Sequence, residues 1–307
     1  MAYRIRKRKS VQGGFRATAI EQIDRSINEI LDGELDRHQT IHQVRKRCKK
    51  LRGLFRLVRP HFDAYADENK FFRDAARDLS FVRDAQSTLD CIDDLIEHSP
   101  ESSDRDLLAV VRERFAERRQ QIVSDRVGVD EKLDRFLGKM RKARQRAGDW
   151  KVTDDGYSAI VDGLVRTYRD GRKARRKIER NPSDHQLHEL RKRVKYHGCH
   201  AAWLRPIWPS LMKGWRHTTD QLADALGDDH DLAVFHQTLL SDRDRLISDH
   251  DRQTLDGLIA RRRGELLTAA RPLAARLFAE KPRRLGVRWG GYWKVWKMTF
   301  DDPPMVS

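Results

Sequence analysis

The sequence has few cysteines and no long apolar segment, and these absences exclude several classes of protein. Its three cysteines, Cys48, Cys91 and Cys199, lie far apart and form no Cys-x-x-Cys pair. They are typical of reduced thiols and not of a disulfide framework or a zinc site. No run approaches the roughly 20 apolar residues of a membrane span, and no apolar stretch follows the basic N-terminus as in a signal peptide. We expect a soluble, cytoplasmic protein.

Acidic residues are scarce relative to basic ones. The chain has 63 Lys and Arg against 47 Asp and Glu, which gives a formal net charge of +16 over 307 residues. A field of this sign attracts polyanions and speeds their association. Nucleic acid, polyphosphate and an anionic membrane surface are therefore all open as partners, and an acidic partner of some kind is expected.

The sequence also lacks the alternating runs of β-branched residues that are typical of strands. Between Gly14 and Lys281, apolar residues recur three and four positions apart, which indicates amphipathic helices. Prolines and glycines such as Pro60, Gly148 and Pro206 divide these segments. Ser183 has the character of a helix N-cap. The sequence therefore predicts an all-α fold.

A basic motif occurs twice, 146 residues apart. Residues 41–60 match residues 187–206 without a gap, and the identical pairs include His42/His188, Arg45/Arg191, Lys46/Lys192, Lys49/Lys195 and Arg59/Arg205. A weaker match pairs 79–84 with 225–231 once one residue is inserted. It ends in Asp84 and Asp231, which we expect to orient a basic residue of a neighbouring helix. Two repeats this long predict two helical bundles and not a solenoid.

The first copy of the motif carries a cationic stripe beside an apolar one. Both have spacings of three and four, about 100° apart around the helix, and no acid interrupts residues 42–59. Like charges at these spacings repel by ~0.2–0.5 kcal/mol a pair. A solvated face is the alternative, but it normally alternates in sign, so we expect a ligand to supply the counter-charge. The apolar stripe is Ile41, Val44, Cys48, Leu51, Phe55 and Val58; the cationic one is His42, Arg45, Lys49, Arg52, Arg56 and Arg59, widened by Lys46 and Lys50.

The second copy is thinner. Gly198 and Ala202 stand where the first copy has Arg52 and Arg56, while His188, Arg191, Lys192, Lys195 and Arg205 remain. A further basic cluster spans residues 166–180, and it either extends the site or forms a solvated helix face.

In these motifs the chain resembles a known family. His-x-x-Arg-Lys-x-x-Lys-x-x-Arg from His42, its copy from His188, and Leu-Gly-Asp-Asp-His-Asp at 226–231 are similar to the CHAD domain, the conserved-histidine α-helical domain. The resemblance covers 14–282, with repeats at about 14–148 and 155–282 and a C-terminal tail at 283–307. It implies two four-helix bundles related by a pseudo-twofold axis, with basic faces lining a central groove or pore. It also implies binding of inorganic polyphosphate and association with polyphosphate granules.

The binding residues that the resemblance and the repeated stripe assign are basic throughout. Arginine can contact phosphate with two nitrogens at once, and lysine adds a mobile point charge. The assigned residues are His42, Arg45, Lys46, Lys49, Arg52, Arg56, His188, Arg191, Lys192, Lys195 and Arg205.

Two other functions compete with polyphosphate binding. A nucleic-acid-binding helical protein would interleave exposed aromatic residues with the basic ones, but the first stripe offers only Phe55, in the core register. A metal-binding or phosphoacceptor role could use His42, His188 and His230, or His197 with His200. The motif histidines lie among cations, which repel a metal ion, and no Walker loop or His-Glu-x-x-His is present. We therefore expect a binding protein that is not an enzyme and needs no cofactor or metal.

The C-terminal tail is rich in aromatic residues. Trp289, Trp293, Trp296 and Phe300 share helical spacing. A packing arm on the domain is the preferred interpretation, and a segment for a membrane surface or a partner is the alternative.

Overall fold

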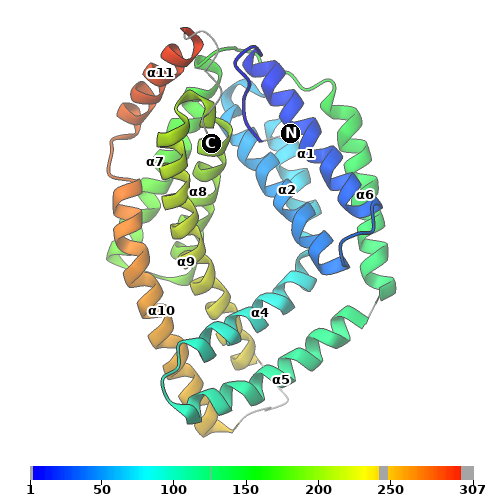
Figure 1. Cartoon of the computed structure of the whole chain (residues 1–307), viewed down its shortest axis with the longest axis vertical. Coiled ribbons are helices and arrows are strands. Elements are labelled where there is room, and N and C mark those ends of the chain that lie inside the picture. Colours follow the sequence, from blue (N-terminus) through cyan, green and yellow to red (C-terminus); the bar gives the residue numbers. More distant parts are fainter. Residues whose placement is uncertain (1–2, 125, 242–247, 299–307) are drawn as a thin grey trace.

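The chain folds into a ring of helices (Figure 1). The computed structural model describes residues 3–124, 126–241 and 248–298, with the side chains of 81–84, 122–124, 126–127 and 241 left aside. Over these ranges it contains α-helices and short 3-10 turns and no strand, which confirms the all-α prediction. The helices are α1 (Val11–Leu31), α2 (Arg37–Leu57), α3 (Tyr65–Arg77), α4 (Ser80–Glu97), α5 (Ser102–Ser124), α6 (Arg126–Ala147), α7 (Ser158–Arg180), α8 (Asp184–Trp203), α9 (Pro209–Ser241), α10 (Asp249–Leu277) and α11 (Pro282–Met298).

The two copies of the basic motif have the same local structure. Asp36 caps α2 by accepting from the Gln39 amide, and Ser183 caps α8 by accepting from the Gln186 amide. Each helix is followed by a 3-10 turn, η1 (Arg59–His61) and η2 (Arg205–Ile207), with a proline at its start. Proline cannot donate the next helical hydrogen bond, so both helices end there. The predicted start at Ser183 is therefore confirmed.

Buried apolar residues form two clusters, and each combines both halves of the chain. The larger one joins α1, α2, α3 and α6 to α7, α8 and α11, with Phe15, Phe55 and Trp203 among its largest side chains. The smaller one joins α4 and α5 to α9 and α10. Since neither cluster belongs to one half alone, the arrangement as two four-helix bundles related by a twofold axis stays a prediction.

The predicted apolar stripe of α2 lies in the larger cluster, where Val44, Leu51 and Phe55 have no exposed surface. The tail joins the same cluster as α11: Trp289, Trp293 and Trp296 are buried, as a packing arm requires. Phe300 lies outside the described residues. None of the helices in the described part of the chain is both long and apolar enough to span a bilayer.

Two glycines allow the helices to approach closely where α2 meets the second half. A Cβ atom on Gly53 would lie 2.6 Å from the Cβ of Cys199 in α8. A Cβ on Gly163 of α7 would lie 2.5 Å from the carbonyl oxygen of Arg56 and closer still to that of Leu57. The His200 imidazole also bonds the Gly53 carbonyl oxygen, with 3.0 Å between Nε2 and the oxygen. The ends of α2, α7 and α8 are thus fixed against one another.

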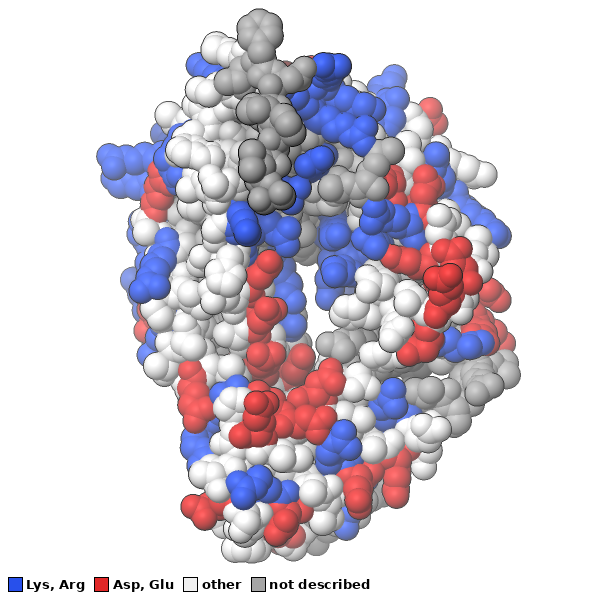
Figure 2. Space-filling view, viewed as in Figure 1, with Lys and Arg blue, Asp and Glu red and all other residues white. Residues whose placement is uncertain are grey.

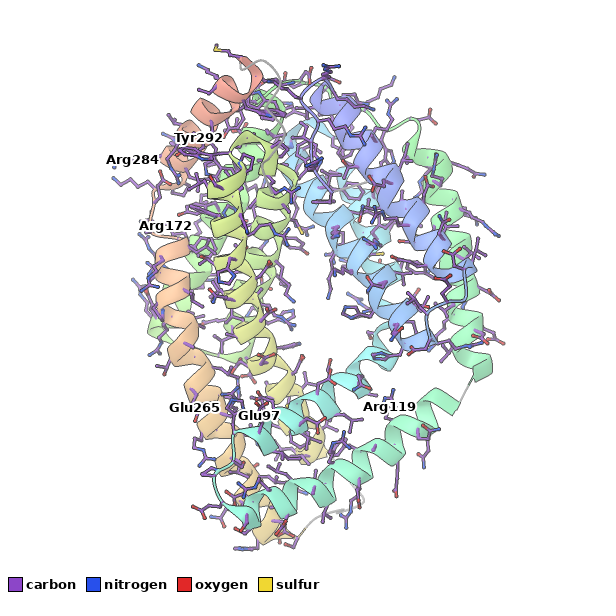
Figure 3. The ribbon with its side chains drawn as sticks, viewed as in Figure 1. Glu97, Arg119, Arg172, Glu265, Arg284 and Tyr292 are labelled. Carbon is purple, nitrogen blue, oxygen red and sulfur yellow. The ribbon has the colours of Figure 1, made fainter. Side chains whose placement is uncertain are left out.

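Away from this contact, α2 and α8 diverge along the two sides of an opening through the molecule (Figure 1). Figure 2 shows that side chains leave the opening unfilled, with Lys and Arg around its upper part and Asp and Glu along its lower margin. At the far end of the ring, Arg262 of α10 donates to both carboxylate oxygens of Asp94 in α4, at 2.8 Å each. These bonds fix α4 to α10 near Glu97 and Glu265, which Figure 3 labels.

Candidate functional site

Arg52 and Arg56 of α2 are held by neutral groups. The Arg56 Nη1 donates to the Asn69 side-chain oxygen at 2.6 Å and to the Arg52 carbonyl oxygen at 3.0 Å, and the Arg52 Nε donates to Asn69 at 3.3 Å. Both guanidinium groups lie over the Tyr196 ring of α8, at 3.9 Å for Arg56 and 5.9 Å for Arg52. Among the described residues, no carboxylate forms an ion pair with either arginine. The two positive charges are thus positioned without being neutralised.

The surroundings of Arg56 disfavour its positive charge. Burial is the main cause of its lowered pKa, and the neighbouring cations Arg52 and Arg193 add to the effect. An arginine nevertheless keeps its proton at any physiological pH. An anion placed beside the pair would offset both the cost of burying the positive charge and the repulsion between the like charges. The site therefore favours a negatively charged ligand.

The other basic residues of α2 extend from this pair toward the start of the helix. Arg45 is half-buried, and its Nη1 donates to the Ala76 carbonyl oxygen in the last turn of α3 at 2.7 Å. His42, Lys46 and Lys49 are exposed. The α2 row therefore runs beside α3, with some members resting on that helix and others facing solvent.

The basic residues of α8 have carboxylates opposite them. The Arg191 Nη1 lies 3.9 Å from Asp231 of α9, the neighbouring-helix contact expected of Asp231. The pKa of Lys195 is lowered to about 8, mainly by burial and also by Arg191, while Asp224 and Asp231 act in the opposite direction. Lys192 forms an ion pair with Glu189 on its own helix. The α8 row is therefore partly neutralised within the protein, unlike Arg52 and Arg56. The side chain of Asp84 lies outside the described residues.

His188 pairs with another histidine. Its ring centroid lies 4.6 Å from that of His230 on α9. The pKa of His188 is lowered to about 4, mainly by burial and also by His230, Lys192 and Arg191. His188 is therefore uncharged at neutral pH, so it can take part in hydrogen bonds there but adds no positive charge.

Arg205 lies at the opposite end of the second copy from His188. It begins η2 after the end of α8, and a helix that rises about 1.5 Å per residue places it roughly 25 Å along the axis from His188. The structure brings Arg52, Arg56 and α8 together at Tyr196 but sets Arg205 beyond that junction. Asn69 and Tyr196 were not predicted as site residues. For Tyr196, its position directly after the basic Lys-Arg-Val-Lys run could have indicated a place in the site.

His197 and His200 are structural residues of the core. The Trp215 Nε1 donates to the His197 Nε2 at 2.8 Å, and the His197 ring stacks on Trp289 with centroids 5.8 Å apart. Burial lowers the pKa of each histidine to about 3. Across the part of the chain that the structure describes, no group of three or more His, Cys, Asp or Glu side chains could hold a metal ion.

These two histidines should make the fold sensitive to acid. The folded pKa of about 3 lies below the ordinary 6.5, so their contribution to stability is full above pH 6.5 and is lost as the pH falls toward 3. In that window, each of the two histidines lowers the free energy of unfolding by about 1.4 kcal/mol for every unit by which the pH falls. Urea denaturation at pH 6.5, 5.5 and 4.5 should show a shallower pH dependence for His200→Gln than for the wild type.

The exposed His250 gives the matched control. His250→Gln should keep the wild-type slope, because both buried histidines remain in place. If stability fell equally with pH in His200→Gln and in the wild type, His200 would not be a buried histidine with a lowered pKa.

Comparison with known proteins identifies a family. The model of the CHAD domain matches residues 17–240, which include both copies of the basic motif and the 226–231 segment. No curated protein matches the chain.

Proposed function

Because the chain belongs to the CHAD domain family, we propose that it binds inorganic polyphosphate along the basic walls of the central opening. The observation that carries this proposal is the Arg52–Arg56 pair. Two guanidinium groups are oriented by Asn69 and Tyr196, and neither partner carries a charge that would compete with a phosphate. Preorganised donors of this kind form the strongest hydrogen bonds with anionic oxygens.

The spacing of the α2 row suits a repeating anion. Residues three and four positions apart stand roughly 4.5–6 Å apart along the helix axis, so His42, Arg45, Lys49, Arg52 and Arg56 offer successive contacts to a chain of phosphates. One small anion could contact only part of this row. The α8 residues His188, Arg191, Lys192 and Lys195 form the second wall in this proposal. They contribute less than the α2 row, because His188 is uncharged and Glu189 pairs with Lys192. The carboxylates of Asp224 and Asp231 offset the charges of Arg191 and Lys195.

The proposal also includes the arrangement of the two repeats, the kind of activity and the association with granules. The two repeats would form bundles related by a pseudo-twofold axis, with α2 and α8 in equivalent places. The protein would act as a binder and not as an enzyme, and it would associate with polyphosphate granules by holding the polymer directly.

A nucleic-acid ligand is the second candidate, since its phosphates would meet the same cations. The buried ring of Tyr196 lies beneath Arg52 and Arg56, with only 8 % of the residue exposed. It therefore offers no open face on which a base could stack, as single-strand binding requires. Polyphosphate has no bases and needs no such surface.

Titration with polyphosphates of several lengths tests the proposal. Affinity should rise with chain length until both walls are occupied, and it should fall steeply between 50 and 200 mM salt, by roughly 10³-fold or more if about six phosphates are contacted. Fluorescence anisotropy with a labelled chain gives the dissociation constants.

Unlabelled single-stranded DNA serves as the competitor at fixed salt. It should displace the labelled chain only at a large excess of phosphate. Displacement at equal phosphate concentration would favour the nucleic-acid candidate, and triphosphate that binds as tightly as a long chain would contradict both.

A further inference from the structure

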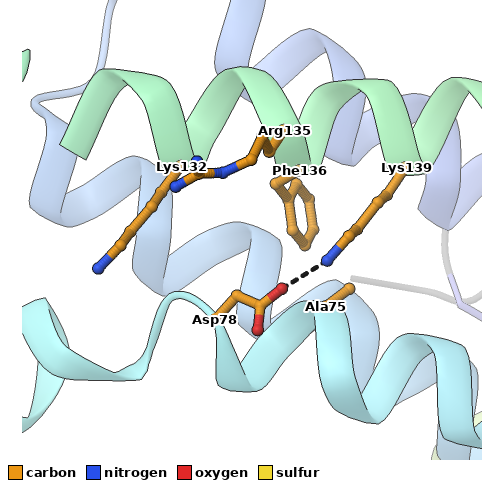
Figure 4. A pocket seen from close by; sticks show the side chains of 6 residues that line it. All are labelled: Ala75, Asp78, Lys132, Arg135, Phe136 and Lys139. Carbon is orange, nitrogen blue, oxygen red and sulfur yellow. Dashed lines mark hydrogen bonds and ion pairs between the residues drawn. The ribbon is translucent and has the colours of Figure 1, made fainter. Parts of the chain in front are cut away.

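A second row of basic residues lies on α6. Lys132, Arg135 and Lys139 are three and four positions apart, so they share one face of the helix. With Ala75 and Asp78 from the end of α3, they line a pocket whose apolar floor is Phe136 (Figure 4). The pocket has a volume of about 430 Å³, many times the roughly 30 Å³ of one water. A phosphate group and its hydrating waters fit in it.

The lining of the pocket is strongly cationic. It has three basic side chains and one carboxylate. The carboxylate is Asp78, and the Lys139 Nζ contacts it at 2.5 Å. Glu131 lies 4.0 Å from Arg135, but both side chains are about two-thirds exposed, so water weakens their attraction. Lysine and arginine bind phosphate with charge-assisted hydrogen bonds, so this lining suits a phosphate group.

The pocket lies close to the beginning of the α2 row. The Arg37 guanidinium at the start of α2 binds both oxygens of Asp130 at the start of α6, at 2.5 and 2.7 Å. The last turn of α3 contacts both rows: Ala75 lines the pocket, and the carbonyl oxygen of Ala76 accepts from Arg45 of the α2 row.

The pocket depends on a feature that the second half of the chain does not share. Helices α3 and α4 are interrupted at Asp78 and Leu79, and this interruption places Asp78 opposite Lys139. In the second half, α9 runs without a break from Pro209 to Ser241 through the segment matched to 79–84. The pocket is thus a property of the first half.

We propose that the pocket between α3 and α6 is a second phosphate-binding site, which takes a phosphate unit of a long chain that extends past His42. Its affinity for phosphate is independent of the central opening, whereas its place on the path of the chain rests on the proposed function. A chain too short to reach beyond the α2 row would not occupy it.

The test compares two double variants of α6 that remove the same charge. Lys132→Ala/Arg135→Ala removes two of the three basic side chains that line the pocket. Arg141→Ala/Lys142→Ala removes two exposed cations that do not line it. With a long chain, the pocket variant should bind about tenfold more weakly than the control, which corresponds to one lost charge-assisted contact. With a chain of about five phosphates the two variants should bind alike.

Inorganic phosphate alone tests the pocket apart from the opening. The measurement is made in an Arg52→Ala/Arg56→Ala background, which removes the competing pair. Phosphate binding, followed by 31P NMR line broadening, should then be lost with the pocket changes and kept with the control changes, and Asp78→Asn should strengthen it several-fold. Equal phosphate binding by the two double variants would overturn the site. Loss of phosphate binding without any effect on long chains would overturn its place on the path. A failure of the proposed function is distinct, because then long chains would bind no better than short ones in the wild type.

Discussion

Replacing Arg52 and Arg56 together with alanine is expected to weaken polyphosphate binding by about 100-fold. Each guanidinium can form charge-assisted hydrogen bonds with phosphate, worth ~1.5–3 kcal/mol apiece, and a loss near 3 kcal/mol is a factor of about 100. Neither side chain is neutralised within the protein, so the loss should appear in full. The dissociation constant of a labelled long chain at fixed salt measures it.

Two further double variants separate position from charge. Arg271→Ala/Arg276→Ala removes two exposed arginines from α10 and should change affinity only a few-fold, through the net charge. Arg191→Ala/Lys195→Ala should cost about tenfold, because Asp224 and Asp231 already offset those charges. Thermal melting confirms folding in each case. If the α10 variant weakened binding as much as the α2 variant, binding would reflect net charge alone and the assigned site would be wrong.

Gly163→Ala is expected to destabilise the fold by about 3 kcal/mol or more, at the upper end of the range for overpacking. The added Cβ would lie 2.5 Å from the Arg56 carbonyl oxygen and closer to that of Leu57, and these are backbone atoms of a helix end that cannot turn aside. Relief requires α7 to move away from α2. Urea denaturation should show a lower midpoint, and polyphosphate binding should weaken as the Arg56 backbone shifts.

Gly257→Ala provides the matched control. Gly257 also lies inside a helix, but a Cβ there meets nothing within 4 Å. This change should stabilise the protein by ~0.5–1 kcal/mol, since alanine loses less backbone freedom on folding than glycine. Should both variants have the same midpoint, the close approach of α7 to α2 would not exist in solution.

Local patterns in the sequence predicted the helices and one side of the site. The three-four spacing of Val44, Leu51 and Phe55 identified the buried face of α2, because the period of a helix is a property of the chain itself. The adjacent row of cations follows from the same arithmetic. The cap at Ser183 was also predictable, since a cap involves residues only three positions apart.

The contacts that distinguish the two walls could not be predicted in this way. Asn69 reaches Arg56 from the next α-helix and Tyr196 from a helix of the second half, and nothing in their own neighbourhoods indicates it. From the sequence, the cationic stripe was expected either to face solvent or to bind a ligand. The structure shows a third arrangement, in which Arg45 and Arg56 rest on α3 through neutral acceptors. The pocket beside α6 was missed because it needs α3 and α6 to be brought together.

The mixed composition of the two apolar clusters affects how the chain folds during its synthesis. Leu89 and Ile92 of α4 and Leu108 and Val111 of α5 pack against α9 and α10, which leave the ribosome more than a hundred residues later. At ~5–20 residues per second, this apolar surface waits roughly 10–30 s for its partners. During that interval the nascent first half exposes the apolar faces of α4 and α5. Chaperone binding or a slow elongation rate would therefore influence the yield of native protein.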